Sequence, residues 1–449
     1  MAVRVITYGT FDLFHQGHIN ILERAKLLGD YLIVGVTSDL FDAHRGKTNL
    51  RQNLLQRVES VRQTGLADEI IVEEYIGQKI GDIQRFQIDV FAIGSDWEGK
   101  FDYLREYCQV VYLQRTEGIS STKLRADLQS ELRLGIIGCG HIAHKFVFEA
   151  ATVHSVNLIA TFSPVPGEAS AFSELHSIPA GFENFDDFIK ELDTVYIASP
   201  HATHYNYAKK CLQAGKHVLC EIPMTLSANE AEELFLLAKQ KNLVLLEASK
   251  TAFCPAFAHL INMVKSGVVG ELIDIQASLS ILKNSFLLEK NSWHDEGSMA
   301  ELGPLALMAV LKMLGYNFLS VNFFTLITSD IDVFTKAVFV YNKAIATITL
   351  GIGMKTEGNL IISGTQGYIY VPAPWWRTEY FELRFEDQNL NRKFFYPFLG
   401  EGLRYEIQEF VEMIAQKRTA SFKLSPTESI WIANIIERFR KKENLTILS

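Results

Sequence analysis

Apolar residues form short runs that end in glycine turns in two regions of the chain. In the first region, the largely apolar residues 3–6 lead into a glycine turn, an amphipathic stretch over 19–28 and a second apolar run over 31–36. Residues 132–162 repeat this order. Strands that alternate with helices in this way are typical of parallel sheets with crossover helices. The pattern therefore predicts two α/β domains that begin near residues 1 and 130.

The pattern changes at about residue 250. Four segments between 272 and 350 are strand-like, and apolar and polar residues alternate in the last of them. Such alternation is typical of an antiparallel sheet with one covered face. Domains contain about 100–200 residues, so we expect three of them in this chain: 1–129, 130–250 and 251–449.

The composition limits the possible partners. The chain is 48% hydrophobic and 21% charged, with a net charge of −9, so we expect no nucleic-acid partner. Its five cysteines are scattered and suit neither disulfides nor a structural zinc site. The N-terminus enters a strand directly, and no apolar run approaches the ~18 residues that span a bilayer. The sequence thus predicts a cytoplasmic protein without membrane association.

Two histidines follow the first glycine turn. His15 and His18 are three residues apart, with Gly17 between them, a spacing that puts both imidazoles on one side of a first helical turn. The start of a helix also presents unpaired backbone N–H groups, which favour an anion. Together with close backbone approach at Gly9, these features suit a polyphosphate under nucleophilic attack.

Further candidate anion-binding residues follow the predicted strands. Lys47 lies in a polar loop, Arg57 on the next helix, and Asp96 just after the strand at 90–94. Residues 115–123 put an arginine, a glycine and hydroxyl groups at a second helix start. Each of these features alone would suggest a solvated surface. Their common position past strand ends favours a binding site, because parallel sheets bind ligands there.

The segment 1–128 resembles the glycerol-3-phosphate cytidylyltransferase family along its whole length. The resemblance is carried by residues 8–13, 15–18, 96–102 and 115–120. It implies a Rossmann-like nucleotidyltransferase sheet that converts CTP and a small alcohol phosphate to a CDP-alcohol and pyrophosphate, with Mg²⁺ on the triphosphate. Such products feed teichoic-acid or capsule polymers. Residues 75–76 are Tyr-Ile where glycerol-type enzymes often carry Asn-Trp, so the choice of polyol phosphate stays open.

The resemblance also implies roles for individual residues, with Arg57 as a contact of the substrate phosphate. The protein would contribute placement and stabilisation of charge while the acceptor phosphate attacks the α-phosphorus of CTP. The implied catalytic residues are His15, His18, Lys47 and Arg115, and the implied nucleotide-binding residues are Gly9, Thr10, Phe11, Asp96, Thr116, Ser120, Ser121 and Thr122.

A second glycine motif opens the other α/β domain. Gly138, Gly140 and Ala143 form G-x-G-x-x-A after a strand and before a helix, the context in which this motif binds a dinucleotide. The next strand ends in residues 161–164, Thr-Phe-Ser-Pro. They include neither an acid for a ribose 2′-OH nor an arginine for a 2′-phosphate. The motif therefore predicts NAD(P) binding, if the site is retained, without choosing between NAD and NADP.

Residues 131–449 resemble the Gfo/Idh/MocA oxidoreductase family. Besides the glycine motif, the resemblance is carried by residues 197–204, 214–223, 267–272 and 362–368. It implies an NAD(P)-binding Rossmann domain followed by a C-terminal α+β domain with a mainly antiparallel sheet. Proteins of both families commonly associate, so we expect a homodimer.

Two positions depart from the pattern of this second family. Ile222 replaces the lysine of its Glu-Lys-Pro motif, and Leu305 replaces its His or Tyr, so both usual proton donors are apolar. One hypothesis is a degenerate, non-redox domain. A second is a bifunctional enzyme that reduces a carbonyl phosphate through a substitute such as His294, Lys250 or Glu301. A third is a transferase that a bound dinucleotide regulates.

Overall fold

The computed structural model divides into two compact units, residues 1–130 and 131–449. It describes residues 3–14, 16–44, 50–74, 77–114, 131–153, 155–282, 297–396 and 398–448.

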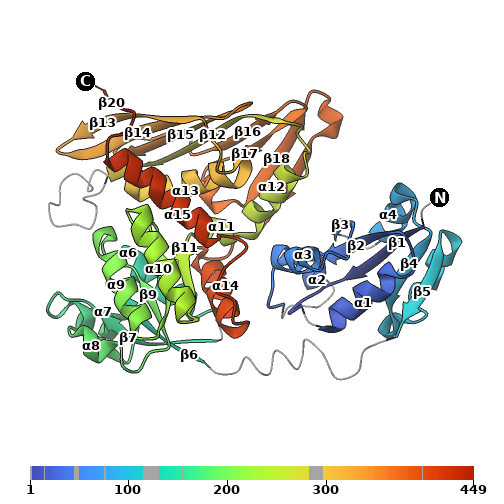
Figure 1. Ribbon diagram of the computed structural model, residues 1–449, viewed down its shortest axis with the longest axis horizontal. Helices are drawn as coiled ribbons and strands as arrows, with labels where there is room; N and C mark the ends of the chain where they lie inside the picture. Colours follow the sequence, from blue (N-terminus) through green and yellow to red (C-terminus); the bar gives the residue numbers. More distant parts are fainter. Residues whose placement is uncertain are drawn as a thin grey trace. The chain divides into compact units, whose positions relative to one another are not determined.

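The first unit is built on a five-stranded parallel sheet with the order β3-β2-β1-β4-β5 (Figure 1). Its strands are β1 (Arg4–Gly9), β2 (Tyr31–Thr37), β3 (Glu69–Glu73), β4 (Val90–Gly94) and β5 (Gln109–Leu113). The helices are α1 (Gln16–Lys26), α2 (Asp39–His44), α3 (Leu54–Gln63) and α4 (Gln78–Phe86), with 3-10 turns η1 (Ser95–Trp97) and η2 (Asp102–Glu106). The strand order reverses between β1 and β4, so ligands are expected at the carboxyl ends of these strands.

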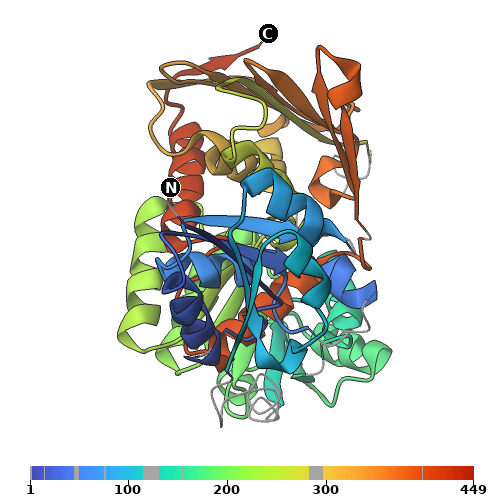
Figure 2. The same cartoon turned by 90° about the vertical axis from the view of Figure 1, so that its right-hand side faces the viewer.

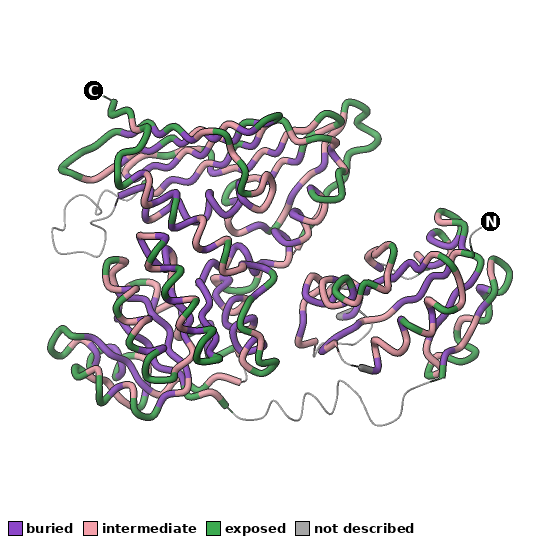
Figure 3. Tube along the Cα trace, viewed as in Figure 1, coloured by how far each residue is buried: buried purple, intermediate pink, exposed green. Residues whose placement is uncertain are grey.

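Alternating strand residues build a core on each face of this sheet. Val5 of β1 packs on one face with Leu22 of α1 and Val58 of α3. The next residue, Ile6, packs on the other face with Ile83 of α4. Because both faces are covered, the strands are nearly continuous apolar runs in the sequence. Figure 3 shows that they are largely buried.

The second unit begins with a six-stranded parallel sheet of order β11-β10-β9-β6-β7-β8. This is the doubly wound order of dinucleotide-binding domains. Its strands are β6 (Leu132–Ile137), β7 (Val156–Phe162), β8 (Ala180–Phe182), β9 (Thr194–Ile197), β10 (His217–Glu221) and β11 (Leu245–Ala248). The helices are α6 (His141–Ala150), α7 (Glu168–His176), α8 (Phe185–Phe188), α9 (His201–Gln213) and α10 (Ala228–Gln240).

The rest of the second unit contains a nine-stranded sheet of order β19-β18-β17-β16-β12-β15-β14-β13-β20. Figure 2 shows this part of the unit from a second direction. Only the β12–β15 and β13–β20 pairs are parallel within the described residues. Its strands are β12 (Leu272–Ile281), β13 (Ser320–Thr328), β14 (Ile331–Val340), β15 (Ile345–Ile352), β16 (Leu360–Gly364), β17 (Gly367–Val371), β18 (Tyr380–Phe385), β19 (Arg392–Phe395) and β20 (Leu445–Ile447). The two parallel sheets and this mainly antiparallel one confirm the expected fold class.

The other α-helices described in this unit lie between or beside its two sheets (Figure 1). They are α11 (Lys250–Phe253), α12 (Pro255–Lys265), α13 (Gly297–Leu314), α14 (Leu403–Ala415) and α15 (Pro426–Arg440). Among the described residues, α13 alone is long and apolar enough to cross a bilayer, but 78% of it is buried inside the unit. Helix α13 is therefore a core helix, packed under β12, β14 and β15.

Candidate active site

The turn after β1 has an unusual backbone. Phe11 and Leu13 have positive φ angles of 56° and 47°. The Phe11 ring lies over Gly9, where a Cβ atom would be 2.9 Å from two ring carbons. A side chain at residue 9 would displace this ring. Backbone conformations of this kind persist only where the surrounding structure holds them in place, and they cluster at functional sites.

His18 lies in the first turn of α1 beside two aromatic rings. The centroid of its ring is 5.4 Å from that of Phe11 and 5.3 Å from that of Phe14. Its side chain is half-buried. Packing against both rings restricts the orientations of the imidazole, as a pre-organised site requires. His15, its predicted partner, lies outside the described residues.

Arg57 of α3 is completely buried and stabilises the turn after β1 through hydrogen bonds. Its Nη1 donates to the Thr10 carbonyl oxygen at 2.6 Å and its Nε to the Gln52 carbonyl oxygen at 3.1 Å. Its Nη2 donates to Asp39 Oδ1 at 2.5 Å, and Asp42 Oδ2 lies 3.6 Å from Nη1. The sequence suggested a phosphate contact at Arg57. In the structure the N–H groups of this guanidinium instead donate hydrogen bonds to oxygens of the protein.

Two buried aspartates complete the frame of the turn. Asp42 accepts hydrogen bonds from the hydroxyls of Thr10, at 3.2 Å, and Thr37. Asp12 accepts hydrogen bonds from the backbone N–H groups of residues 51 and 52, at 3.0 and 2.9 Å. The segments after β1 and β2 and before α3 are thereby tied together at the carboxyl end of the sheet.

Asp96 lies in η1, directly after β4, and is exposed. The structure thus places it at the carboxyl end of the strand beside β1, on the same edge of the sheet as the turn between β1 and α1. The other predicted residues of this site lie outside the described residues: Lys47, Arg115, Thr116, Ser120, Ser121 and Thr122.

A buried polar cluster at the end of β3 was missed by the sequence reasoning. The Glu73 carboxylate pairs with the Lys79 ammonium, which lies 4.4 Å from the centroid of the Tyr8 ring. The Tyr8 hydroxyl donates to Asp82 Oδ2 at 2.8 Å. Among the described residues, Glu73 Oε2 is buried without a hydrogen bond. The one available signal was an acid at a strand end. Residues 75–76 follow but lie outside the described residues.

The glycine turn of the second unit has the backbone that its motif requires. Gly138 has a φ of +96°, and a Cβ atom there would lie 2.6 Å from the Ala198 carbonyl oxygen. The Gly138 N–H donates to the Phe162 carbonyl oxygen at 2.8 Å, which ties the turn to the end of β7. Gly140 precedes α6, and Ala143 is fully buried inside that helix. The backbone is therefore shaped to bring a phosphate to the start of α6.

A carboxylate reaches the end of β7 from outside the strand. Glu168, the first residue of α7, accepts a hydrogen bond through Oε2 from the hydroxyl of Ser163, which follows β7 and is buried. The sequence predicted no acid at this strand end. The sequence alone does not indicate Glu168, because this residue comes five residues after Ser163, beyond a turn that ends at Gly167.

A buried cluster of ionisable residues lies at the ends of β10 and β11. The Tyr196 hydroxyl donates to Glu221 Oε1, and burial raises the pKa of Glu221 to about 6. Burial also raises the pKa of Glu406, on α14, well above its ordinary value. Neither oxygen of Glu406 has a hydrogen-bond partner among the described residues. Lys250 lies near both carboxylates, and burial lowers its pKa. The cluster can therefore hold a proton near neutral pH.

Lys250 originates one strand away from the apolar Ile222. Strands β10 and β11 pair in parallel with Glu221 opposite Ala248. Ile222 follows β10 directly, and Lys250 comes two residues after β11, at the start of α11. Neighbouring strands are about 4.8 Å apart, so Lys250 follows the strand next to the one that precedes Ile222.

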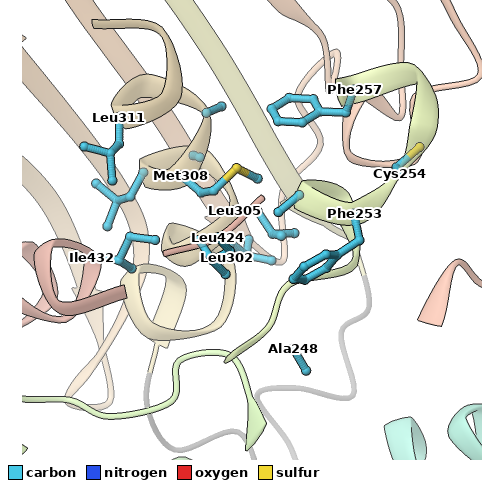
Figure 4. Close-up of a cluster of buried hydrophobic side chains, with 14 of the residues drawn as sticks. Ala248, Phe253, Cys254, Phe257, Leu302, Leu305, Met308, Leu311, Leu424 and Ile432 are labelled. Carbon is cyan, nitrogen blue, oxygen red and sulfur yellow. The ribbon is translucent and has the colours of Figure 1, made fainter. Parts of the chain in front are cut away.

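The second departure, Leu305, is part of the hydrophobic core. It is buried in a cluster that includes Phe253, Leu302 and Met308 (Figure 4). Glu301, one turn earlier on α13, has its Oε1 atom 4.0 Å from His201 Nδ1. His294 lies outside the described residues.

The first unit is similar to known cytidylyltransferases. A family model described as "Cytidylyltransferase-like" matches residues 6–127. The glycerol-3-phosphate cytidylyltransferase of Bacillus spizizenii is 52% identical over 127 residues, which cover 28% of this chain and 98% of that protein.

The second unit is similar to oxidoreductases. A family model described as "Oxidoreductase family, NAD-binding Rossmann fold" (Gfo/Idh/MocA) matches residues 132–249. The scyllo-inositol 2-dehydrogenase (NADP(+)) IolU of Bacillus subtilis is 28% identical, over 69% of this chain and 97% of that protein. A crystal structure of KijD10, a 3-ketoreductase from Actinomadura kijaniata, superposes with a TM-score of 0.63 at 21% identity. The superposition covers 71% of this chain and 100% of that chain, and it shows that the two folds are similar.

Proposed function

Because the chain belongs to the cytidylyltransferase-like family through residues 6–127 and to the Gfo/Idh/MocA oxidoreductases through residues 132–249, we propose that its first unit makes a CDP-alcohol. The substrates are CTP and a small polyol phosphate, with glycerol phosphate as the first choice, and the second product is pyrophosphate. The observation that carries the proposal is the 52% identity to a glycerol-3-phosphate cytidylyltransferase over 98% of its length.

The proposed reaction is an in-line displacement. An oxygen of the acceptor phosphate forms a bond to the α-phosphorus of CTP, and the bond from that phosphorus to pyrophosphate breaks. Catalysis of this kind depends on placement and on stabilisation of phosphoryl charge. His18 would donate to the reacting phosphates, with its ring oriented by the contacts with Phe11 and Phe14. Mg²⁺ arriving with the triphosphate would neutralise part of its charge; the described residues contain no cluster of three metal-ligating side chains.

The turn after β1 and the buried residues that stabilise it have separate roles in this proposal. Gly9, Thr10 and Phe11 would present backbone groups to the nucleotide, and Asp96 would lie close to it. Arg57 acts through Thr10, whose carbonyl oxygen it holds at 2.6 Å, so we assign it a positioning role. His15, Lys47, Arg115, Thr116, Ser120, Ser121 and Thr122 keep the phosphate-binding roles that the family resemblance implies.

The acceptor can be identified directly. Purified protein, CTP and Mg²⁺ are mixed with glycerol-3-phosphate, glycerol-2-phosphate or ribitol-5-phosphate, and pyrophosphate and the CDP-alcohol are quantified. We expect one of these to support turnover. Failure of every alcohol phosphate would refute the proposal. A CDP-alcohol made in the cytoplasm would supply units of a teichoic-acid or capsule polymer.

The second unit is proposed to bind NAD(P) without the family's usual proton transfer. The glycine turn at Gly138 keeps its shape, whereas Ile222 and Leu305 are apolar and Leu305 is part of the core. Such a domain could regulate the transferase. Titrating NADH into the CTP assay tests this, since coupling requires that the dinucleotide prefer one conformational state.

A second candidate function is favoured by Lys250. A carbonyl reductase needs a hydride for the carbon and a proton for the oxygen. A bound NAD(P)H would supply the hydride, and Lys250, beside Glu221 and Glu406, would supply the proton. The bifunctional enzyme would reduce a carbonyl phosphate to the alcohol phosphate that the first unit uses. Oxidation of NADH or NADPH by a keto- or aldo-phosphate, lost in Lys250→Met, would favour this candidate over a degenerate domain.

The domain limits and the homodimer are also proposals. We place the domains at 1–129, 130–250 and 251–449. The nine-stranded sheet turns Phe324, Leu326 and Ile345 outward, each more than a third exposed. A second copy of the chain would cover these side chains. Light scattering should report a dimer in solution and a shift toward monomer in Leu326→Glu.

A further inference from the structure

We propose that Glu168 makes the second unit select NAD(H) over NADP(H), by binding the ribose 2′-hydroxyl and repelling a 2′-phosphate. The inference rests on the dinucleotide binding proposed above and decides which dinucleotide is bound. It assigns the role to a residue outside the strand end where an acid is usually found.

The position of Glu168 is set by a specific contact. Its Oε2 atom accepts a hydrogen bond from the Ser163 hydroxyl, at the first residue after β7. The other oxygen, Oε1, accepts no hydrogen bond within the described part of the chain. Ser163 is completely buried, while Glu168 is half-buried. The serine therefore anchors one carboxylate oxygen at the strand end and leaves the other for a ligand.

The carboxylate also lies near the glycine turn. The Gly138 N–H bonds to the Phe162 carbonyl oxygen at 2.8 Å, so the turn and the end of β7 are adjacent. Burial raises the pKa of the Cys139 thiol to about 12, and the nearby negative charge of Glu168 contributes to the shift. Cys139 stands between the two glycines that approach the pyrophosphate. A dinucleotide on this turn would extend its adenosine ribose toward the end of β7.

Charge around the site favours the unphosphorylated ribose. Residues 146–189 contain no lysine or arginine, although they include six acids. One of these, Glu183, accepts a hydrogen bond through Oε1 from the Gly167 N–H at 2.6 Å, beside Glu168. A 2′-phosphate would thus meet carboxylates and no basic side chain from this segment. A ribose hydroxyl can instead donate to Oε1, and a hydrogen bond to a charged group is stronger than one between neutral groups.

The test is calorimetric titration of the full chain with NADH and with NADPH. We expect NADH to bind at least about tenfold more tightly, which corresponds to about 1.4 kcal/mol. Glu168→Gln should weaken NADH binding by about tenfold and leave NADPH binding unchanged or tighter. Glu168→Lys should bring the two affinities together or invert their order. Glu174→Gln removes the same charge from an exposed position of α7 and should change neither affinity.

Three results would overturn the inference. Equal or tighter binding of NADPH by the unaltered chain is the first. An equal loss for both dinucleotides in Glu168→Gln is the second, because it indicates a merely structural role for the Ser163 contact. The third is no binding of either dinucleotide, which would also remove the dinucleotide site; the CTP assay would still stand as the separate test of the first unit.

Discussion

Replacing Arg57 by methionine tests whether the turn after β1 is held from below by a buried cation. Methionine keeps much of the length of the side chain but removes its N–H donors. The Thr10 and Gln52 carbonyl oxygens lose their partner, and Asp42 keeps a charge without its cation. We expect the first unit to be strongly destabilised and the transferase to lose activity with it.

The magnitude follows from the burial of the groups left behind. Arg57 and Asp42 have no exposed side-chain surface, and breaking a buried pair costs about 3–5 kcal/mol. Asp39 adds little, because 36% of its side chain is exposed and water can replace the arginine. A loss of this size is a large part of a typical stability of about 5–15 kcal/mol. Adding Asp42→Asn should recover about 1–2 kcal/mol, since the stranded charge is removed.

Urea-dependent hydrogen exchange on the full chain provides the assay, read on peptides that cover β1 and α1. Arg62→Met is the matched control. Arg62 lies on the same helix and pairs with Glu59 at 2.8 Å, but 59% of its side chain is exposed, so its loss should cost less than about 1 kcal/mol. If Arg57→Met changes the free energy of unfolding no more than Arg62→Met, the proposed frame does not hold the turn.

Three further predictions address both units. His18→Ala should reduce CTP-dependent pyrophosphate release by about 100-fold or more, with an unchanged circular dichroism spectrum; residual turnover near the original rate would exclude a role for this imidazole. Gly138→Ala should abolish detectable dinucleotide binding in calorimetry, because its Cβ would lie 2.6 Å from a carbonyl oxygen. Gly215→Ala, with a similar positive φ but open surroundings, should leave binding intact, and equal effects would contradict the steric argument. Burial lowers the pKa of His259 to about 4, below an unfolded value of about 6.5, so stability present at neutral pH is lost as the pH falls from about 6.5 toward 4. Between pH 7 and pH 5 the loss should be roughly 2 kcal/mol; urea titrations should show a flatter profile for His259→Phe, and identical profiles would refute this explanation.

Local sequence patterns predicted the parts of the fold that depend on neighbouring residues. Glycine turns after apolar runs located β1 and β6, and the alternation at 345–350 located β15. The pairing of β15 with β12 in parallel was not predictable, because these strands are more than 60 residues apart along the chain. Nothing in either strand specifies which partner it takes.

The predicted site residues also differ in whether their positions depend on local sequence or on contacts between distant segments. The turn at Gly9 and the position of His18 on α1 follow from spacing alone. The burial of Arg57 does not, because its partners come from three other segments and become neighbours only in the folded sheet. Glu168 and Lys250 were overlooked or undervalued for a related reason. Glu168 contacts Ser163 at the end of β7 and Lys250 follows β11, next to β10, so a position-by-position comparison with the family motifs does not consider either residue.

The central claim is tested most directly by phosphorus NMR of the full chain mixed with CTP, Mg²⁺ and glycerol-3-phosphate. The account predicts that CDP-glycerol and pyrophosphate appear in equal amounts and that His18→Ala forms neither. Intact CTP after prolonged incubation of the folded protein with this and every other polyol phosphate would contradict it.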